Sequence, residues 1–148
     1  MLNIEVKAPL VEGKEEIINY IPQRVPFVMV DSLWFNDEEK TITSLSVEDD
    51  NILVDNGILT ESAMLENMAQ TAAVRVGYYC KQNNIEVPVG FITAIKEFKI
   101  FSFPIVGQTI YTEALQVNEV MNFTIVRGRI YLDEVLAAEA EVRVFINK

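Results

Sequence analysis

One segment restricts the folds open to this chain more than any other. Residues 61–81, ESAMLENMAQTAAVRVGYYCK, are dense in Ala, Met, Leu and Glu and lack proline, which predicts a single helix roughly 31 Å long. Thr60 is a suitable N-cap, Glu61 suits the positive end of the helix dipole, and Pro88 lies beyond the end. Small or apolar residues occupy nearly the whole circumference, so we expect the rest of the chain to enclose this helix.

Most of the remaining sequence is strand-like. A short helix over about residues 14–20 is predicted first, ending against Pro22. Residues 27–35 and 40–47 are apolar or β-branched and are separated by a turn, which predicts a hairpin. Four further runs fill the C-terminal third, with turn residues between them: 89–103, 107–117, 122–132 and 136–147. Their short connections predict a four-stranded antiparallel meander.

These elements predict an α+β fold of the hot-dog type, in which an antiparallel sheet of about five to six strands wraps around one long central helix. The last run supports a sheet with one wet face, because Ala138 and Val142 alternate with Glu139 and Glu141. With 148 residues, of which 50% are hydrophobic, the chain can bury a real core, and we expect one domain spanning residues 1–148.

Charge and composition exclude several classes of function. The net charge of −10 argues against nucleic acid and anionic membranes as partners, since both select for basic surfaces. No stretch resembles a secretion signal or a membrane span, so we expect a cytoplasmic protein. Cys80 is the only cysteine, which excludes an internal disulfide and a cysteine zinc cluster. We expect no metal and no cofactor.

The absence of histidine is the strongest chemical restriction. The sequence contains none, so no Ser-His-Asp triad, Cys-His pair, histidine base or histidine-ligated metal can form within it. Any chemistry must therefore use carboxylates, hydroxyls, Lys, Tyr or backbone amides.

Glu66 is the first candidate for such chemistry. It lies inside the predicted helix among small neighbours, where an aliphatic residue is usual. Arg75 is nine residues away, which places it on the opposite side of the helix and leaves Glu66 without an intrahelical counter-ion. A carboxyl group enclosed in this way favours its protonated form, as a general acid requires. The simpler alternative is that Glu66 bonds backbone amides or a partner subunit and has no chemical role.

Three segments together resemble the 3-hydroxyacyl-acyl carrier protein dehydratase family of hot-dog proteins. They are YIPQRVPFVMVDSL, NGILTESAMLENMAQTAA and GFITAIKEFKIFSFPIVGQTI, which cover roughly residues 20–110 in the family's order. The family has a Pro-His-Arg-Tyr-Pro-Phe-like segment, a His-Phe-Pro-Gly-like loop and a helix that reads Glu-Ala-Met-Ala-Gln. This chain retains Pro22, Arg24, Pro26, Phe27, Asp31, Glu66, Met68, Ala69, Gln70 and Gly107.

The departures from the family concern its histidines. Gln23 stands where the first segment has histidine, and counting back from Glu66 puts Ile52 where the loop has its catalytic histidine. The resemblance implies that histidine removes the α-proton of a 3-hydroxyacyl thioester while the helix carboxyl group protonates the departing hydroxyl. This sequence retains only the acid. With an Asn and an Asp-Gly-like turn before the helix, the sequence resembles the diverged branch associated with aryl-polyene pigment synthesis more closely than the rest of the family.

The candidate site therefore has Glu66 as its catalytic residue. Gln70 shares its helix face and is predicted to orient the carboxyl group or to fill space with one hydrogen bond. Asn56 and Gly57 form a turn that could belong to a substrate loop, and Phe91 is a candidate for lining an acyl tunnel, although both are also common structural features.

Three functional classes fit these residues. The first is a dehydratase-like enzyme on acyl carrier protein thioesters, weak or inactive alone and active beside a histidine-bearing paralogue. The second is a hot-dog thioesterase that uses one helix carboxylate. The third is a non-catalytic acyl-binding or structural subunit. The apolar helix also predicts a homodimer or higher homo-oligomer, or a hetero-oligomer with that paralogue.

Overall fold

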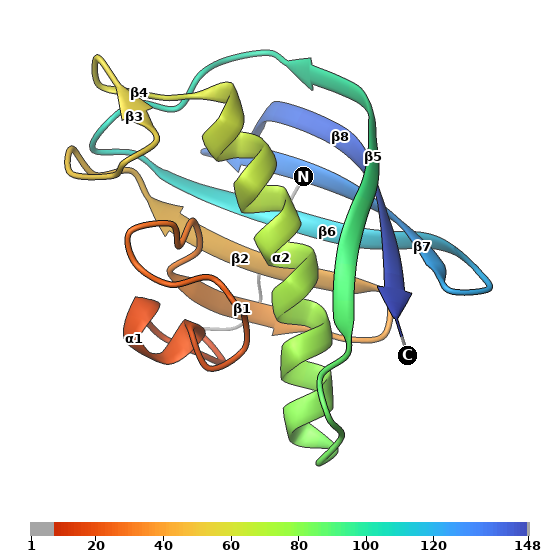
Figure 1. The fold of residues 1–148 in the computed structure, drawn as a ribbon. Coiled ribbons are helices and arrows are strands. Elements are labelled where there is room, and N and C mark those ends of the chain that lie inside the picture. The colour runs from red at the N-terminus through yellow and green to blue at the C-terminus, as the bar shows by residue number, and fades with distance from the viewer. Residues whose placement is uncertain (1–7, 148) are drawn as a thin grey trace.

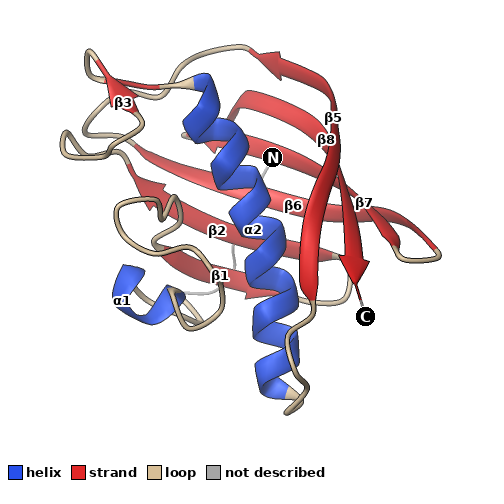
Figure 2. Ribbon diagram, viewed as in Figure 1, coloured by secondary structure: helices blue, strands red, loops and turns tan. Residues whose placement is uncertain are grey.

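A six-stranded antiparallel sheet curves around one long helix in the computed structural model, which describes residues 8–147. In spatial order the strands are β1 (Ser32–Asn36), β2 (Lys40–Ser46), β6 (Thr109–Val120), β7 (Phe123–Leu132), β8 (Val135–Asn147) and β5 (Val89–Ile100). The helix α2 (Glu61–Gln82) lies across the concave side of the sheet (Figure 1). Figure 2 shows the same layering by element type. The predicted hot-dog fold is confirmed.

Helix α2 forms and is placed as its sequence predicts. The backbone N–H of Ala63 donates to Thr60 Oγ1 at 3.4 Å, so Thr60 is the N-cap. The helix packs on β2, β6 and β7. At Gly128 on β7, an added Cβ atom would lie 2.9 Å from the Met68 sulfur, so helix and sheet meet there without room for a side chain. Buried side chains from both layers form the main core, including Leu45, Leu59, Met64, Met68, Ile110, Ile130 and Ala140.

The N-terminal segment packs against the C-terminal half of α2. It contains α1 (Lys14–Ile17), which is shorter than the helix predicted over 14–20, and then an irregular stretch up to β1. Ile17, Ile21, Val28 and Val74 are buried together there in a second apolar cluster.

Two sequence-based expectations are wrong in detail. Residues 27–31 are not a strand, because β1 begins at Ser32, and the buried backbone before it pairs with side chains of α2. The predicted four-stranded meander is a three-stranded one, β6–β7–β8, because β5 pairs with β8 at the far edge of the sheet. The connection from β5 to β6 carries the chain past β8 and β7, and Phe101 N–H donates to Ala137 O along it.

The loop before α2 contains a small hairpin that periodicity did not reveal. Strands β3 (Val54–Asp55) and β4 (Ile58–Leu59) flank Asn56 and Gly57, whose φ angles of 52° and 75° are those of a tight hairpin turn. The turn predicted at Asn56-Gly57 is confirmed. Among residues 8–147, no helix has the length and apolar character needed to cross a membrane.

Candidate functional site

Glu66 is half-buried on α2 and has a hydrogen-bond partner. Gln70 Nε2, one helical turn away, donates to Glu66 Oε1 at 2.9 Å. Arg75 lies on the other side of the helix, as expected, where its guanidinium donates to the carbonyl of Glu38. Burial lowers the pKa of Arg75, an effect that the charges of Glu119 and Asp37 oppose. The Glu66 carboxyl group is therefore oriented by an amide and not by a cation.

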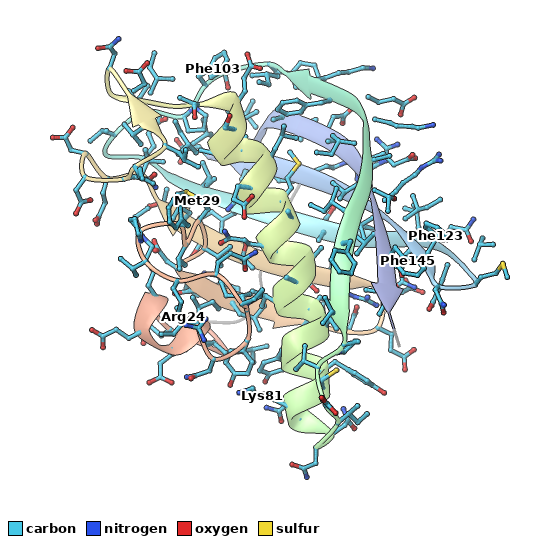
Figure 3. All side chains as sticks on the ribbon, in the orientation of Figure 1. Arg24, Met29, Lys81, Phe103, Phe123 and Phe145 are labelled. Carbon is cyan, nitrogen blue, oxygen red and sulfur yellow. The ribbon has the colours of Figure 1, made fainter. Side chains whose placement is uncertain are left out.

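The orientation of the Gln70 side chain is set by the backbone around it. Gln70 is fully buried, and its Oε1 accepts from the N–H of Met29 at 2.7 Å. Its Nε2 donates to the carbonyl of Phe27 at 2.8 Å as well as to Glu66. Because only the amide oxygen can accept from Met29, the amide nitrogen must face Glu66. Figure 3 shows Met29 beside the first half of α2.

Asn67 extends this arrangement under the helix. Its Nδ2 donates to the carbonyl of Met29 at 2.7 Å, and its Oδ1 accepts from Thr112 Oγ1 at 2.5 Å. Thr71 Oγ1 donates to the carbonyl of Asn67 at 2.8 Å and lies 2.8 Å from Thr43 Oγ1. Asn67 and the three threonines are fully buried, so every one of these polar groups needs the partner it has. The network ties the segment next to Glu66 to both the helix and the sheet.

The loop before α2 is attached to the same segment. Asn51 Oδ1 accepts from the N–H of Leu53 at 2.8 Å, and Thr60 Oγ1 donates to the carbonyl of Leu53 at 2.8 Å. Asn51 Nδ2 lies 3.4 Å from the sulfur of Met29. Ile52, which the family resemblance places at the position of the catalytic histidine, is 50% exposed on this loop. Hydrogen bonds thus hold the loop, while the side chain of Ile52 is half exposed to solvent.

A surface hollow lies where α2 begins. It is lined by Asp55, Asn56, Ile58, Thr60, Glu61, Ser62 and Phe103. Figure 3 shows Phe103 at this end of the molecule. Glu66 is not among the lining residues and lies one helical turn beyond Ser62. The start of a helix presents free N–H groups and a partial positive charge, which suits a thioester carbonyl oxygen.

The candidate residues fall into three places. Glu66 and Gln70 are hydrogen-bonded to each other, and Asn56 and Gly57 form the β3–β4 turn beside the hollow. Phe91 is 53% exposed on β5, opposite Phe145 and on the face of the sheet turned away from α2. Within residues 8–147, no cluster of His, Cys, Asp and Glu could hold a metal ion.

Sequence reasoning did not identify Asn67 or the backbone of residues 27–29 as parts of the site. The signal for Asn67 was available, because it replaces the alanine of the Glu-Ala-Met-Ala-Gln pattern. The role of residues 27–29 had no such signal, since their backbone rather than their side chains makes the contacts.

Comparison with known proteins identifies the family. Residues 15–148 match the ApeP-like family, described as ApeP dehydratase. The chain belongs to the ApeP-like dehydratase family. A search of curated protein sequences found no match. Among solved structures, the dehydratase heterocomplex ApeI:P from Xenorhabdus doucetiae is similar, with a TM-score of 0.81 at 15% identity over 89% of this chain and 91% of that one.

Two other solved structures of similar fold contain coenzyme A or acetyl-CoA. A hypothetical thioesterase from Streptococcus pneumoniae, solved with coenzyme A, has a TM-score of 0.64 at 9% identity over 78% of this chain and 84% of that one. A protein from Streptococcus mutans bound to acetyl-CoA has a TM-score of 0.63 at 11% identity, over 78% of this chain and 86% of that chain. At these identities the likeness establishes the shared fold.

Proposed function

We propose that this chain is the acid-supplying subunit of a dehydratase that acts on 3-hydroxyacyl thioesters of acyl carrier protein, in fatty-acid or polyene-type biosynthesis. The observation that carries the proposal is a helix carboxylate, Glu66, held in place by Gln70 in a sequence without histidine. Membership of the ApeP-like dehydratase family supports the reaction class. The chain has the acid of the reaction and lacks the base.

The reaction removes water from a 3-hydroxyacyl thioester. A base takes the α-proton, the electron pair of the broken C–H bond forms the double bond, and the β-hydroxyl leaves as water after it is protonated. In this proposal Glu66 gives that proton through the oxygen that does not accept from Gln70. Because general base catalysis contributes about 10²–10⁴-fold, the chain without a histidine should be correspondingly slow.

A histidine-bearing partner subunit would supply the missing base. The similar structure from Xenorhabdus doucetiae is described as a heterocomplex, which supports the idea that ApeP-like chains work with a second dehydratase chain. We therefore place the complete site at an interface, with Glu66 contributed by this chain and an imidazole by its partner.

Two alternatives have specific support. The hollow at the start of α2 and the coenzyme A bound to similar folds favour a thioesterase that polarises the thioester carbonyl with helix amides. The absence of histidine favours a non-catalytic subunit that retains only a structural or acyl-binding role. Release of free thiol from an acyl thioester would identify the first, and binding without turnover in any mixture would identify the second.

The test is to measure dehydration of a 3-hydroxyacyl-carrier protein by this chain alone and after mixing with a histidine-bearing hot-dog dehydratase encoded in the same genome. We expect little turnover by this chain alone and a marked gain in the mixture. The Glu66→Gln variant, which keeps the shape of the side chain and its bond with Gln70, should remove that gain. Glu15→Gln, the same change on the exposed side of α1, should leave it intact.

Rapid turnover by this chain alone would contradict the proposal and would require another base, of which Asp55 beside the hollow is the first to examine.

A further inference from the structure

The strand β5 leaves one side of its backbone without a partner in residues 8–147, because it is the last strand of the sheet and pairs only with β8. It is also unusually apolar for a free edge. Phe91, Ile92 and Ile95 are 53%, 45% and 41% exposed. A long apolar edge strand is a site for pairing with another chain, and proteins that leave one exposed must control what pairs with it.

The face of the sheet turned away from α2 carries charges in alternating rows that end at β5. In the first row, Glu113 on β6 stands opposite Arg129 on β7, which stands opposite Glu139 on β8, which stands opposite Lys99 on β5. Arg129 and Glu113 are 3.7 Å apart. Opposite charges on neighbouring strands stabilise a sheet, and in this row the charge on each strand is opposite to the charge on the next.

The second row follows the same pattern. Arg127 on β7 stands opposite Glu141 on β8, which stands opposite Lys96 on β5. Both rows therefore finish with a lysine at the free edge. Lys96 and Lys99 are exposed, and neither forms an ion pair with another described residue.

The acid between these lysines does not neutralise the edge. Glu97 Oε2 lies 3.4 Å from Arg127, two strands inward, so its carboxylate leans over the sheet and away from the free side of β5. A strand added at this edge would meet Lys96 and Lys99. The alternation continues only if that strand presents carboxylates on the same face.

A second copy of this chain does not meet that requirement when the two-fold axis lies near these lysines. Two β5 strands related by a two-fold axis run antiparallel and bring the lysines of both copies to one seam. With the axis between Lys96 and Lys99, each lysine faces a lysine, and with the axis near Ile95 the two Lys96 side chains meet on the diagonal. Like charges in these positions oppose pairing, and their effect is specific to self-association.

We propose that the β5 edge selects a different hot-dog chain with an acidic edge strand, and that Lys96 and Lys99 disfavour pairing of the chain with itself. This inference rests on the proposed function only for the kind of partner, a second dehydratase chain. The apolar side chains of β5 stabilise the pairing of the two strands, and the two lysines determine which partner strand is favoured. The simpler reading of edge lysines is that they prevent any pairing, which predicts a chain that stays monomeric in every mixture.

The experiment uses the full chain and an acidic-edge variant of it, Lys96→Glu/Lys99→Glu, which stands in for the partner. One of the two proteins is labelled with ¹⁵N, they are mixed at equal concentration in low salt, and native mass spectrometry counts the dimers. We expect mixed dimers well above the statistical half, with the excess falling as salt screens the charges. The matched control is Lys96→Arg/Lys99→Arg, which keeps the charge and should mix with the unmodified chain statistically.

A second arm does not require the acidic variant to fold. Lys96→Gln/Lys99→Gln removes the like charges, and sedimentation should show about tenfold tighter self-association than the unmodified chain in low salt. Statistical mixing with the acidic variant, equal self-association of the neutral variant, or monomers in all mixtures would each overturn the proposal. Because both arms measure assembly and not turnover, a failure of the dehydratase proposal would leave these results unaffected.

Discussion

Single polar side chains beneath α2 determine where the backbone next to Glu66 lies. Gln70 and Asn67 together bind the N–H and the carbonyl of Met29, and Gln70 also binds the carbonyl of Phe27. Residues 27–31 lie outside any strand. These side-chain bonds therefore satisfy backbone groups that strand pairing would satisfy within a sheet. The cost of losing a buried partner is larger than the gain from making the bond, so the network should be sensitive to single changes.

Asn67→Ala tests this network. The change leaves the Met29 carbonyl and the Thr112 hydroxyl buried without their partner, and we expect the free energy of unfolding to fall by about 2–4 kcal/mol. Urea denaturation followed by circular dichroism measures it. Asn19→Ala makes the same chemical change at an exposed position and should cost less than about 0.5 kcal/mol. Equal stability of the two variants would show that water replaces the Asn67 contacts.

For single residues, the sequence predicted the contact between Glu66 and Gln70 but not the backbone groups that surround it. Glu66 and Gln70 are four residues apart, so their contact follows from helical spacing. That Gln70 would also hold residues 27–29 could not be predicted, because nothing in a pattern of apolar and polar residues shows which backbone groups lack a strand partner. The sequence predicted a more enclosed acid, whereas Glu66 is only half-buried. Its hydrogen-bond partner is the amide of Gln70 and not a counter-ion.

Among the elements, α2 depends on small residues where other segments touch it. Gly77 is the closest such contact. A Cβ atom added there would lie 2.0 Å from the carbonyl oxygen of Tyr20, so the segment after α1 packs directly on the helix backbone. Tyr20 also packs against the second apolar cluster, which includes Ile17, Ile21 and Val74.

Gly77→Ala should therefore destabilise the protein although alanine is the better helix former. We expect a net loss of about 1–3 kcal/mol, because the steric cost exceeds the gain of about 1 kcal/mol in helix propensity. Thermal unfolding measures the loss. The control Ser62→Ala, at an exposed position on the same helix, should leave the melting temperature nearly unchanged. A more stable Gly77→Ala protein would mean that the segment after α1 moves aside without cost.

The elements themselves were largely predictable, and their order in the sheet was not. Strong periodicity and clear turn residues located α2, β2 and the four C-terminal strands. The position of β5 beside β8 was missed, because a run of strand-like residues states which face is apolar but not which neighbour it joins. The two-residue strands β3 and β4 are too short to produce an alternating pattern, although the Asn56-Gly57 turn between them was predicted.

For the molecule as a whole, net charge and local charge lead to different expectations. The chain carries a net charge of −10, yet the free edge of its sheet ends in Lys96 and Lys99. The total predicts repulsion from acidic partners at long range, while the edge favours a partner with acidic residues at short range. We therefore expect such a partner to associate slowly at low salt. Once it is bound, we expect it to be preferred over a second copy of this chain.

The division of labour between two chains can be tested directly in one assay. The histidine-bearing partner is first altered so that its own helix carboxylate becomes glutamine, and dehydration of a 3-hydroxyacyl-carrier protein is then measured after mixing it with this chain. If Glu66 is the acid of a shared site, this mixture should turn over substrate, and the same mixture made with Glu66→Gln should be slower by about 10²–10⁴-fold. Turnover that is the same with Glu66 and with Glu66→Gln would contradict the assignment of Glu66 as the catalytic acid.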